Sequence, residues 1–151
     1  MIKIICIGKI KEAFFKEAIN EYIKRLSKYT KINIIELPDY DLNNKELTLQ
    51  KESENILKNI NEKDYCITLE IEGKILTSLE LAQKIDKTLI DNSNICFVIG
   101  GSYGLDEKVK QRSNYKLSFS KQTFPHQLFR IMLLEQIYRS FKIINNESYH
   151  K

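Results

Sequence analysis

Short continuous runs of apolar residues alternate along the chain with longer stretches whose apolar residues are spaced as on one side of a helix. The short runs predict strands at residues 2–8, 31–38, 64–71, 95–101 and 115–119. The longer stretches predict helices at residues 11–28, 46–60, 77–90, 105–112 and 125–143. Strands that alternate with helices are typical of an α/β fold, in which helices cover both faces of a mostly parallel sheet. Because no linker or repeat interrupts the pattern, we expect one domain over residues 1–151.

Local signals refine some of these boundaries. Gly73 marks a turn after the third strand. Thr77 followed by Glu80 has the spacing of a capping box, so a helix is expected to begin there. The run 95–101 is apolar on both faces, as a central parallel strand must be.

Three segments follow predicted strands at the edge of the sheet where ligands of such folds bind. They are the residues just after Leu69, Gly-Gly-Ser-Tyr-Gly at 100–104, and Ser-Lys-Gln-Thr-Phe-Pro-His at 120–126. The glycines at 100–104 allow the backbone to approach a ligand closely, although a tight strand-to-helix turn also explains them. These segments are therefore the candidate ligand-binding loops.

The composition is that of a globular protein, with 42% hydrophobic and 29% charged residues. No apolar run approaches the roughly 18 residues that a membrane span requires. The first residues lack the pattern of a signal peptide, because their apolar run is short and charges follow at once. We therefore expect a cytoplasmic protein with no membrane partner. Cys6, Cys66 and Cys96 lie far apart inside apolar runs, which favours buried free thiols over disulfides or a zinc site.

Charge is unevenly distributed about a net value of +4. Residues 1–31 carry a net +5, residues 32–97 a net −6 and residues 98–151 a net +5. The two basic ends favour an anionic partner, although solvated helix faces also account for them.

The chain offers no complete catalytic set of its own. The glycine loop lacks the Gly-Lys-Ser/Thr of a Walker A motif and the spacing of a dinucleotide fingerprint. No nucleophile–base–acid triad, pair of carboxylates or Cys/His metal set stands out, so we expect no metal. If the protein is an enzyme, a bound cofactor is expected to supply the reactive group.

Three segments together resemble the RlmH family of SPOUT-class methyltransferases. They are Phe-Val-Ile-Gly-Gly-Ser-Tyr-Gly at 97–104, Leu-Ser-Phe-Ser-Lys-Gln-Thr-Phe-Pro-His at 117–126, and the terminal Tyr-His-Lys at 149–151. The resemblance covers the whole chain, and the C-terminal third carries most of its specificity. It implies methylation at N3 of a pseudouridine in 23S ribosomal RNA, in the decoding-side stem-loop of the large subunit, on assembled ribosomes.

The same resemblance implies that S-adenosylmethionine binds in a C-terminal trefoil knot, held largely by backbone groups. Its contacts, carried over by motif, are Leu69, Gly100, Phe119, Ser120, Lys121, Gln122, Thr123 and Phe124. A homodimer is also implied, in which the long C-terminal helices pack together, with ribosomal RNA recognised by its shape and phosphates. Gln122 departs from the apolar residue usual in the family, which affects side-chain packing on the cofactor. His126 is expected to shape the cofactor loop.

The end of the chain is the predicted catalytic segment. Tyr149 would stack on or hydrogen-bond the flipped base. His150 would accept or relay the proton of the acceptor nitrogen, since an imidazole titrates near neutral pH. Lys151 and Arg139 would hold phosphate or stabilise negative charge on the base, although an ion pair with Glu135 also explains Arg139. The alternative for the tail is a disordered end.

Other functions remain compatible with these residues. One is a SPOUT methyltransferase with a different RNA target, and another is a non-catalytic ribosome-binding factor that keeps the fold. A different nucleotide-using α/β enzyme is the third, and the missing phosphate-loop signature counts against it.

Overall fold

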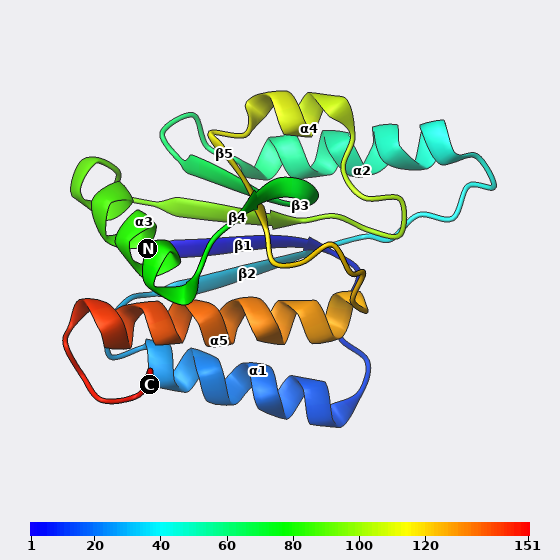
Figure 1. The fold of residues 1–151 in the computed structure, drawn as a ribbon. Coiled ribbons are helices and arrows are strands. Elements are labelled where there is room, and N and C mark those ends of the chain that lie inside the picture. The colour runs from blue at the N-terminus through cyan, green and yellow to red at the C-terminus, as the bar shows by residue number, and fades with distance from the viewer.

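A five-stranded sheet forms the centre of the molecule. In the computed structural model, which describes residues 1–151, the strand order is β2-β1-β4-β3-β5 (Figure 1). Every neighbouring pair of strands is parallel. The strands are β1 (Ile2–Ile7), β2 (Ile32–Leu37), β3 (Tyr65–Ile75), β4 (Ile95–Ile99) and β5 (Tyr115–Ser118). The predicted mostly parallel sheet is therefore confirmed, and its central strands β1 and β4 are buried along their whole length, as the apolar runs indicated.

Helices cover both faces of the sheet, also as predicted. They are α1 (Ala13–Leu26), α2 (Lys45–Asn59), α3 (Ser78–Asp91), α4 (Glu107–Arg112) and α5 (His126–Ile144). One hydrophobic core lies between the sheet and α1, α3 and α5, and a second, smaller core lies under α2 and α4 (Figure 1). The capping box predicted at the start of α3 is present, with Thr77 and Glu80 each bonded to the other's backbone N–H. None of the helices combines the length and hydrophobicity that a membrane span requires.

The third strand differs from its prediction. The turn predicted at Gly73 is wrong, because β3 continues through this residue to Ile75. The register of β3 against β5 shifts between Leu69 and Lys74, and Gly73 lies in this irregular stretch. A Cβ atom added to Gly73 would lie 2.7 Å from the backbone carbonyl carbon of Leu117. The glycine is thus required by the close approach of β5 and not by a chain reversal.

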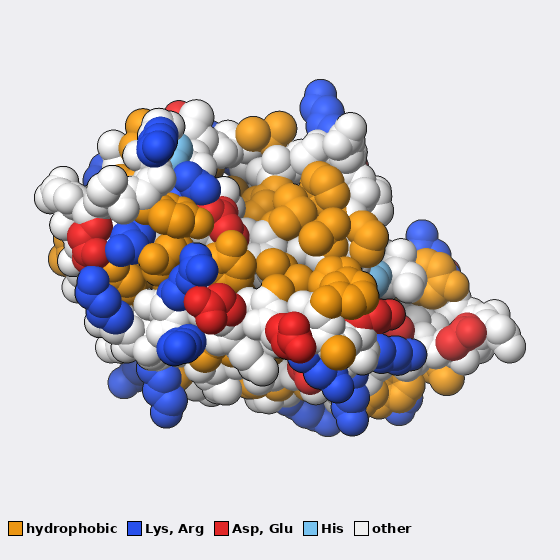
Figure 2. Space-filling model, turned by 90° about the horizontal axis from the view of Figure 1, so that it is seen from below, with side chains coloured by type: hydrophobic (Ala, Val, Ile, Leu, Met, Phe, Trp, Pro, Cys, Tyr) orange, Lys and Arg blue, Asp and Glu red, His pale blue; other side chains and the backbone are white.

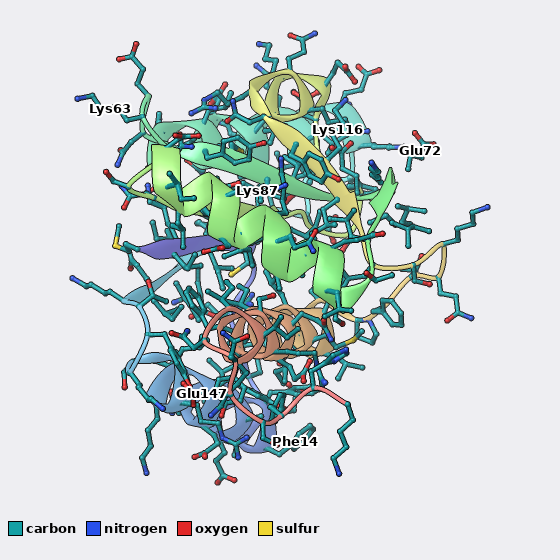
Figure 3. All side chains as sticks on the ribbon, turned by 60° about the vertical axis from the view of Figure 1, so that its left-hand side comes forward. Phe14, Lys63, Glu72, Lys87, Lys116 and Glu147 are labelled. Carbon is teal, nitrogen blue, oxygen red and sulfur yellow. The ribbon has the colours of Figure 1, made fainter.

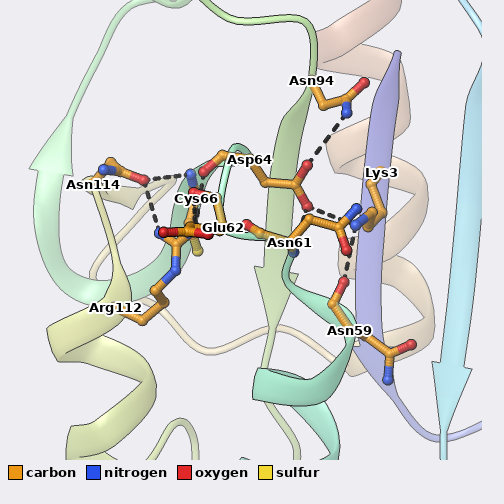
Figure 4. Close-up of polar contacts among 9 residues, drawn as sticks. All are labelled: Lys3, Asn59, Asn61, Glu62, Asp64, Cys66, Asn94, Arg112 and Asn114. Atoms are coloured by element: carbon orange, nitrogen blue, oxygen red, sulfur yellow. Dashed lines mark hydrogen bonds and ion pairs between the residues drawn. The ribbon is translucent and has the colours of Figure 1, made fainter.

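Buried charged and amide groups tie together the amino-terminal edge of the sheet (Figure 4). The Lys3 ammonium, on β1, forms a 2.6 Å ion pair with Asp64, whose side chain is fully buried ahead of β3. Asp64 also accepts hydrogen bonds from the backbone N–H of Asn61 (2.9 Å) and the side chain of Asn94 (3.3 Å). Arg112, at the end of α4, donates to the carbonyls of Asn61 (2.9 Å) and Asp64 (3.0 Å). Charges buried at this edge therefore have partners, as the low-dielectric interior demands.

The two helices on the outside of the larger core differ in how much apolar surface they bury. Ile19 and Leu26 of α1 are buried, whereas Phe14, at the start of its predicted apolar stripe, is 62% exposed. Figure 3 shows Phe14 at the foot of the molecule, beside α1 and away from the sheet. In contrast, seven residues of α5 are buried, so this helix forms part of the core.

The three cysteines are buried and free, as predicted. Burial raises the pKa of the Cys6 thiol to about 12 and that of Cys66 to about 11. Such thiols stay protonated at neutral pH and pack as small apolar side chains.

Candidate functional site

A cleft opens at the carboxyl edge of the sheet, where the three predicted loops meet. It is lined by the middle of β3 (residues 69–71), where the third predicted strand was expected to end, by the ends of β4 and β5, by the glycine loop and by the first turn of α5. All the predicted cofactor residues except Lys121 line this cleft: Leu69, Gly100, Phe119, Ser120, Gln122, Thr123 and Phe124. His126 lines it as well, which agrees with a part in shaping the loop. The structure therefore brings together segments that are far apart in the sequence.

The cleft has the chemistry of a site for an adenosyl group without phosphates. Its walls are largely apolar, with Ile99, Leu117 and Phe129 among them, and no lysine or arginine lines it. The first turn of α5 offers backbone N–H groups that could hold a phosphate, but the cleft adds no cation to neutralise its charge and carries the carboxylate of Glu70. A sulfonium ion, by contrast, is itself positively charged. Apolar side chains and strand-end backbone groups suit an adenine ring. The lining residues thus fit S-adenosylmethionine better than a nucleoside triphosphate.

The glycine loop is shaped by close contacts that only glycine permits. The N–H of Gly104 donates to the carbonyl of Gly101 at 3.0 Å, and Gly104 has a φ of +76°. A Cβ atom on Gly100 would overlap the carbonyl of Gly104, and one on Gly101 would lie 2.9 Å from a carboxylate oxygen of Glu52. Gly100 therefore lets this loop fold back on itself, Gly101 leaves room for the Glu52 side chain, and Gly104 adopts the left-handed conformation.

The loop between β5 and α5 forms the opposite wall and is ordered by local bonds. The backbone N–H of Gln122 donates to the Ser120 hydroxyl at 3.0 Å, and the Ser118 hydroxyl donates to the Ser120 carbonyl at 3.0 Å. The ring of Phe129 packs against Phe119, with centroids 5.0 Å apart, and stacks on Phe124 at 6.1 Å. The aromatic side chains thus face the helix and fix the loop.

Three of the four predicted catalytic residues, Arg139, Tyr149 and His150, form a separate cluster beside the second half of α5, and Lys151 is exposed next to them in the sequence. The Tyr149 hydroxyl donates to Glu135 at 3.1 Å, and the Arg139 guanidinium lies 4.8 Å above the Tyr149 ring. Arg139 also forms an ion pair with Glu135 and lies 3.1 Å from Nδ1 of His150. Burial and the Glu135 carboxylate raise the pKa of Tyr149, which keeps the phenol protonated. The tail is therefore bound to the helix in this structure, and the Glu135–Arg139 ion pair is present as well.

The arrangement around His150 fixes which ring nitrogen carries the proton. Arginine stays charged and can only donate hydrogen bonds. Nδ1 of His150 therefore accepts from Arg139, and the proton of the neutral ring lies on Nε2. Consequently Nδ1 is the nitrogen that could take a further proton, once the bond to Arg139 is broken.

A second anchor for the tail was not predicted. Glu147 accepts hydrogen bonds from Lys142 (2.8 Å), Lys28 (3.0 Å) and the Tyr29 hydroxyl (2.9 Å). These donors, Lys142 first, lower the pKa of Glu147 to about 2. In Figure 3, Glu147 lies beside α1. The only signal in the sequence was an acidic residue in a basic C-terminal segment, and this did not reveal its partners in the turn after α1.

The tail cluster and the cleft do not meet within one chain. Neither Arg139 nor residues 149–151 line the cleft. In Figure 1 the C-terminus lies beside the later turns of α5, whereas the cleft adjoins its first turn. Between them lies an apolar groove that shares two lining residues with the cleft, and its walls are Tyr22, Leu76, Thr77, Ser78, Leu81, Leu117, Phe119, Ile131, Met132, Glu135 and Gln136. Figure 2 shows hydrophobic side chains gathered in the hollowed middle of one face of the molecule, with basic side chains toward its rim.

Comparisons with known proteins agree with this architecture. A family model described as "Predicted SPOUT methyltransferase" matches residues 1–150. The chain is 55% identical over 157 aligned residues to ribosomal RNA large subunit methyltransferase H of Clostridium botulinum (strain Alaska E43 / Type E3), with 99% of each chain covered. It is 54% identical, with the same coverage, to the protein of that name from the Okra / Type B1 strain.

Among solved structures, the fold is similar to that of a probable methylase family protein from Haemophilus influenzae Rd KW20, with a TM-score of 0.57 and 16% identity. That match covers 99% of this chain and 70% of the other, and it supports the fold alone. The family resemblance predicted from the glycine loop, the β5–α5 loop and the tail is confirmed by the match over nearly the whole chain. The chain belongs to the SPOUT methyltransferase family.

Proposed function

We propose that this protein methylates N3 of a pseudouridine in 23S ribosomal RNA, in the decoding-side stem-loop of the large subunit, on assembled ribosomes in the cytoplasm. The observation that carries the proposal is the cleft beside β3, β4 and β5, whose walls are largely apolar and include no lysine or arginine. The names of the relatives, which are ribosomal RNA large subunit methyltransferases and cover nearly the full length, favour this RNA as the substrate.

S-adenosylmethionine is the proposed cofactor, held by the cleft residues predicted above. When bound, it supplies an electrophilic methyl group, so the protein must provide position and not a nucleophile of its own. Gly100 follows the end of β4, and Leu69 lies within β3 just beyond Thr68, the last residue of β3 that pairs with β4, so that backbone groups at both positions can bond the adenine edge. The loop from Phe119 to Phe124 would close over the ligand, whereas Lys121 points outside the lining. The trefoil knot that the resemblance implies stays a prediction.

The acceptor nitrogen of the base carries a proton that must leave before it can act as a nucleophile. We assign its removal to His150, through Nδ1 after release from Arg139 or through a relay. Arg139 and Lys151 would then stabilise the negative charge that develops on the base. Tyr149 would contact the base edge or face, once its own bond to Glu135 is exchanged.

A homodimer would resolve the separation of the tail from the cleft. The groove beside α5 exposes apolar walls at Ile131 and Met132, near the middle of the helix. A twofold contact centred there would pack two α5 helices antiparallel and set the second half of one beside the first turn of the other. The tail of one protomer would then reach the cleft of its partner. We therefore propose that each active site contains one protomer's cleft and the partner's tail.

The RNA would be bound through its shape and phosphates. The net positive charge of residues 1–31 and 98–151 supplies the attraction. α1 and α5, which lie side by side in Figure 1, belong to these two basic segments.

The test is methyl transfer to ribosomes from a strain that lacks the modification, followed by mass spectrometry of the modified nucleotide. We expect a single methyl group on N3 of a pseudouridine in 23S ribosomal RNA. A methyl group on another RNA or on another atom of the base would show that the proposed target is wrong, although the protein is a methyltransferase. Failure to bind S-adenosylmethionine in calorimetry would remove the enzymatic function altogether.

A mixing experiment tests the shared active site. One variant lacks residues 149–151 and keeps its cleft, and the other carries Gly100→Ala and keeps its tail. Each alone is expected to be inactive, because a Cβ at Gly100 disrupts the glycine loop. Co-expressed subunits should recover activity if the cleft uses the partner's tail. Recovery is impossible if each cleft uses its own tail, since no protomer then has both parts.

A further inference from the structure

Behind the glycine loop, on the side away from the cofactor cleft, lies a carboxylate that has no partner. Glu52, on the second turn of α2, is only 3% exposed, and neither of its carboxylate oxygens has a hydrogen-bond partner. Its oxygens lie 2.9 and 3.2 Å from where a Cβ atom of Gly101 would be. An ionised carboxylate buried without a partner is costly, so native structures seldom keep one unless something binds it.

Glu52 lines a pocket that has the features of a site for an organic cation. Two further carboxylates, Asp39 and Asp41, come from the β2–α2 loop, and the rings of Tyr40 and Tyr103 complete the wall. No lysine or arginine lines this pocket. Carboxylates attract a cation, and the faces of tyrosine rings add a cation–π contribution.

Without a ligand, the pocket keeps Glu52 partly neutral. Burial, and then the charge of Asp39, raise the pKa of Glu52 to about 7, against a smaller opposing effect of the Tyr40 backbone. A bound cation would restore the charged carboxylate. The structure contains no group of three or more His, Cys, Asp or Glu side chains placed to hold a metal ion, so the geometry favours an organic cation.

We propose that this pocket binds the guanidinium group of an arginine side chain presented by a protein partner. The planar guanidinium matches a carboxylate through two parallel N–H···O bonds, and it stacks on aromatic rings. Because both oxygens of Glu52 are enclosed beside Gly101, its side chain would turn toward the pocket to form these bonds. Nucleic acid is disfavoured here because three carboxyl groups would repel its phosphates. The pocket would be an interaction site separate from the cofactor cleft, with the glycine loop as the wall between them. It does not depend on the proposed methylation.

The test titrates the full chain with the short peptide acetyl-Gly-Arg-Gly-amide, whose blocked termini carry no charge. Binding is followed by the NMR chemical shifts of the protein's backbone amides. The control peptide carries citrulline, which has the shape of arginine without its charge. We expect the arginine peptide to shift the amides of residues 39–41, 48 and 101–103, and the citrulline peptide to leave them in place. Glu52→Gln should weaken binding by about tenfold or more, because one charged hydrogen-bond pair is lost.

Glu54→Gln is the matched control, since Glu54 is an exposed residue on the same helix and makes the same change of charge. It should bind the arginine peptide like the unchanged protein. Thermal unfolding of Glu52→Gln checks that it is folded, and Asp39→Asn gives a second variant in the same pocket. Equal shifts with both peptides, or unchanged binding by both pocket variants, would overturn the proposal. Shifts of the same amides by guanosine or cytidine, but not by the arginine peptide, would make this a base pocket and also overturn it.

Discussion

The two edges of the sheet use buried charge in opposite ways. At the amino-terminal edge, Lys3 and Asp64 form a buried ion pair whose remaining hydrogen-bonding capacity is met by amides and backbone groups. At the carboxyl edge, Glu52 is buried with no partner, and an open cleft adjoins it through the glycine loop. Lys3 and Asp64 thus have partners and Glu52 has none, although the carboxyl edge also holds the buried Arg130, which pairs with Glu36 at 2.6 Å and donates to the Gly8 carbonyl at 3.0 Å.

The comparison separates the groups that stabilise the fold from the groups that are left free to bind ligands. Ion pairs and amides that satisfy one another hold the amino-terminal ends of the strands together, and these groups are therefore not free to bind a ligand. Unpaired groups and glycines at the strand ends weaken the fold locally, but they leave backbone and carboxylate free for ligands. Changes at the first edge should therefore alter unfolding, and changes at the second should alter binding and turnover.

The largest expected effect is on stability, from breaking the buried pair. Lys3→Met leaves Asp64 buried without its cation, which should lower the free energy of unfolding by about 3–5 kcal/mol. Urea denaturation measures this, with the exposed Lys9→Met as the control. S-adenosylmethionine binding by the folded fraction should not change. A loss below 1 kcal/mol would show that this edge does not carry the stability assigned to it.

Next in size is the loss of turnover on removing the tail. Deleting residues 149–151 should lower the rate of methyl transfer by at least about 10²-fold, because a proton acceptor and a cation are removed. Cofactor binding, measured by calorimetry, should stay within about twofold, since none of these residues lines the cleft. Normal turnover by the truncated protein would exclude the tail from the mechanism.

A smaller effect, on stability against pH, is expected for Glu52. Its pKa is raised from 4.5 to about 7 in the folded state, so the folded protein holds a proton that the unfolded chain releases. The contribution of Glu52 to the free energy of unfolding therefore falls as pH rises from 4.5 to 7 and is constant above that range. Glu52→Gln should remove this loss and be roughly 1–3 kcal/mol more stable than the unchanged protein above pH 7. Parallel unfolding curves for the two proteins at every pH would contradict this, and Glu54→Gln should show no such difference.

The smallest effect is expected at the second anchor of the tail. Glu147→Gln removes the charge that Lys28 and Lys142 hold, so amide exchange at residues 148–151 should quicken. Methyl transfer should fall only roughly two- to fivefold, because exposed ion pairs contribute little. The pKa of Glu147 is lowered, so its contribution is present above pH 4.5 and is lost as pH falls toward 2. Glu17→Gln, at an exposed residue, is the control. An equal effect of both variants would show that Glu147 does not hold the tail in place.

Much of the fold followed from local patterns. All ten elements were located from the sequence. Most are long or apolar enough for their own period to be read, whereas α4 has six residues with one apolar side chain and β5 has four residues. The rule that ligands bind at strand ends placed Leu69, the glycine loop and the β5–α5 loop at one edge. The role of Gly73 could not be predicted, since the need for a glycine there comes from the backbone of β5, more than 40 residues away.

The parts of the site that escaped prediction depend on packing between distant segments. Glu52 belongs to a polar helix that gave no reason to distinguish it from Glu54, and its burial arises only from contact with the glycine loop. Two partners of Glu147, Lys28 and Tyr29, lie in the turn after α1, near the other end of the chain. The spacing of the tail from the cleft also needed coordinates, because it depends on the direction of α5.

The strand order has a consequence for how the chain acquires its shape. β1 is made first, yet it is wholly buried between β2 and β4, and β4 ends only at Ile99. While the ribosome synthesises the intervening residues, one side of this apolar strand stays unpaired and open to unwanted contacts with other nascent chains. Closure must wait for a distant partner, which makes folding slow for a protein of this size. Low temperature and dilute expression should therefore raise the soluble yield more than any single surface substitution.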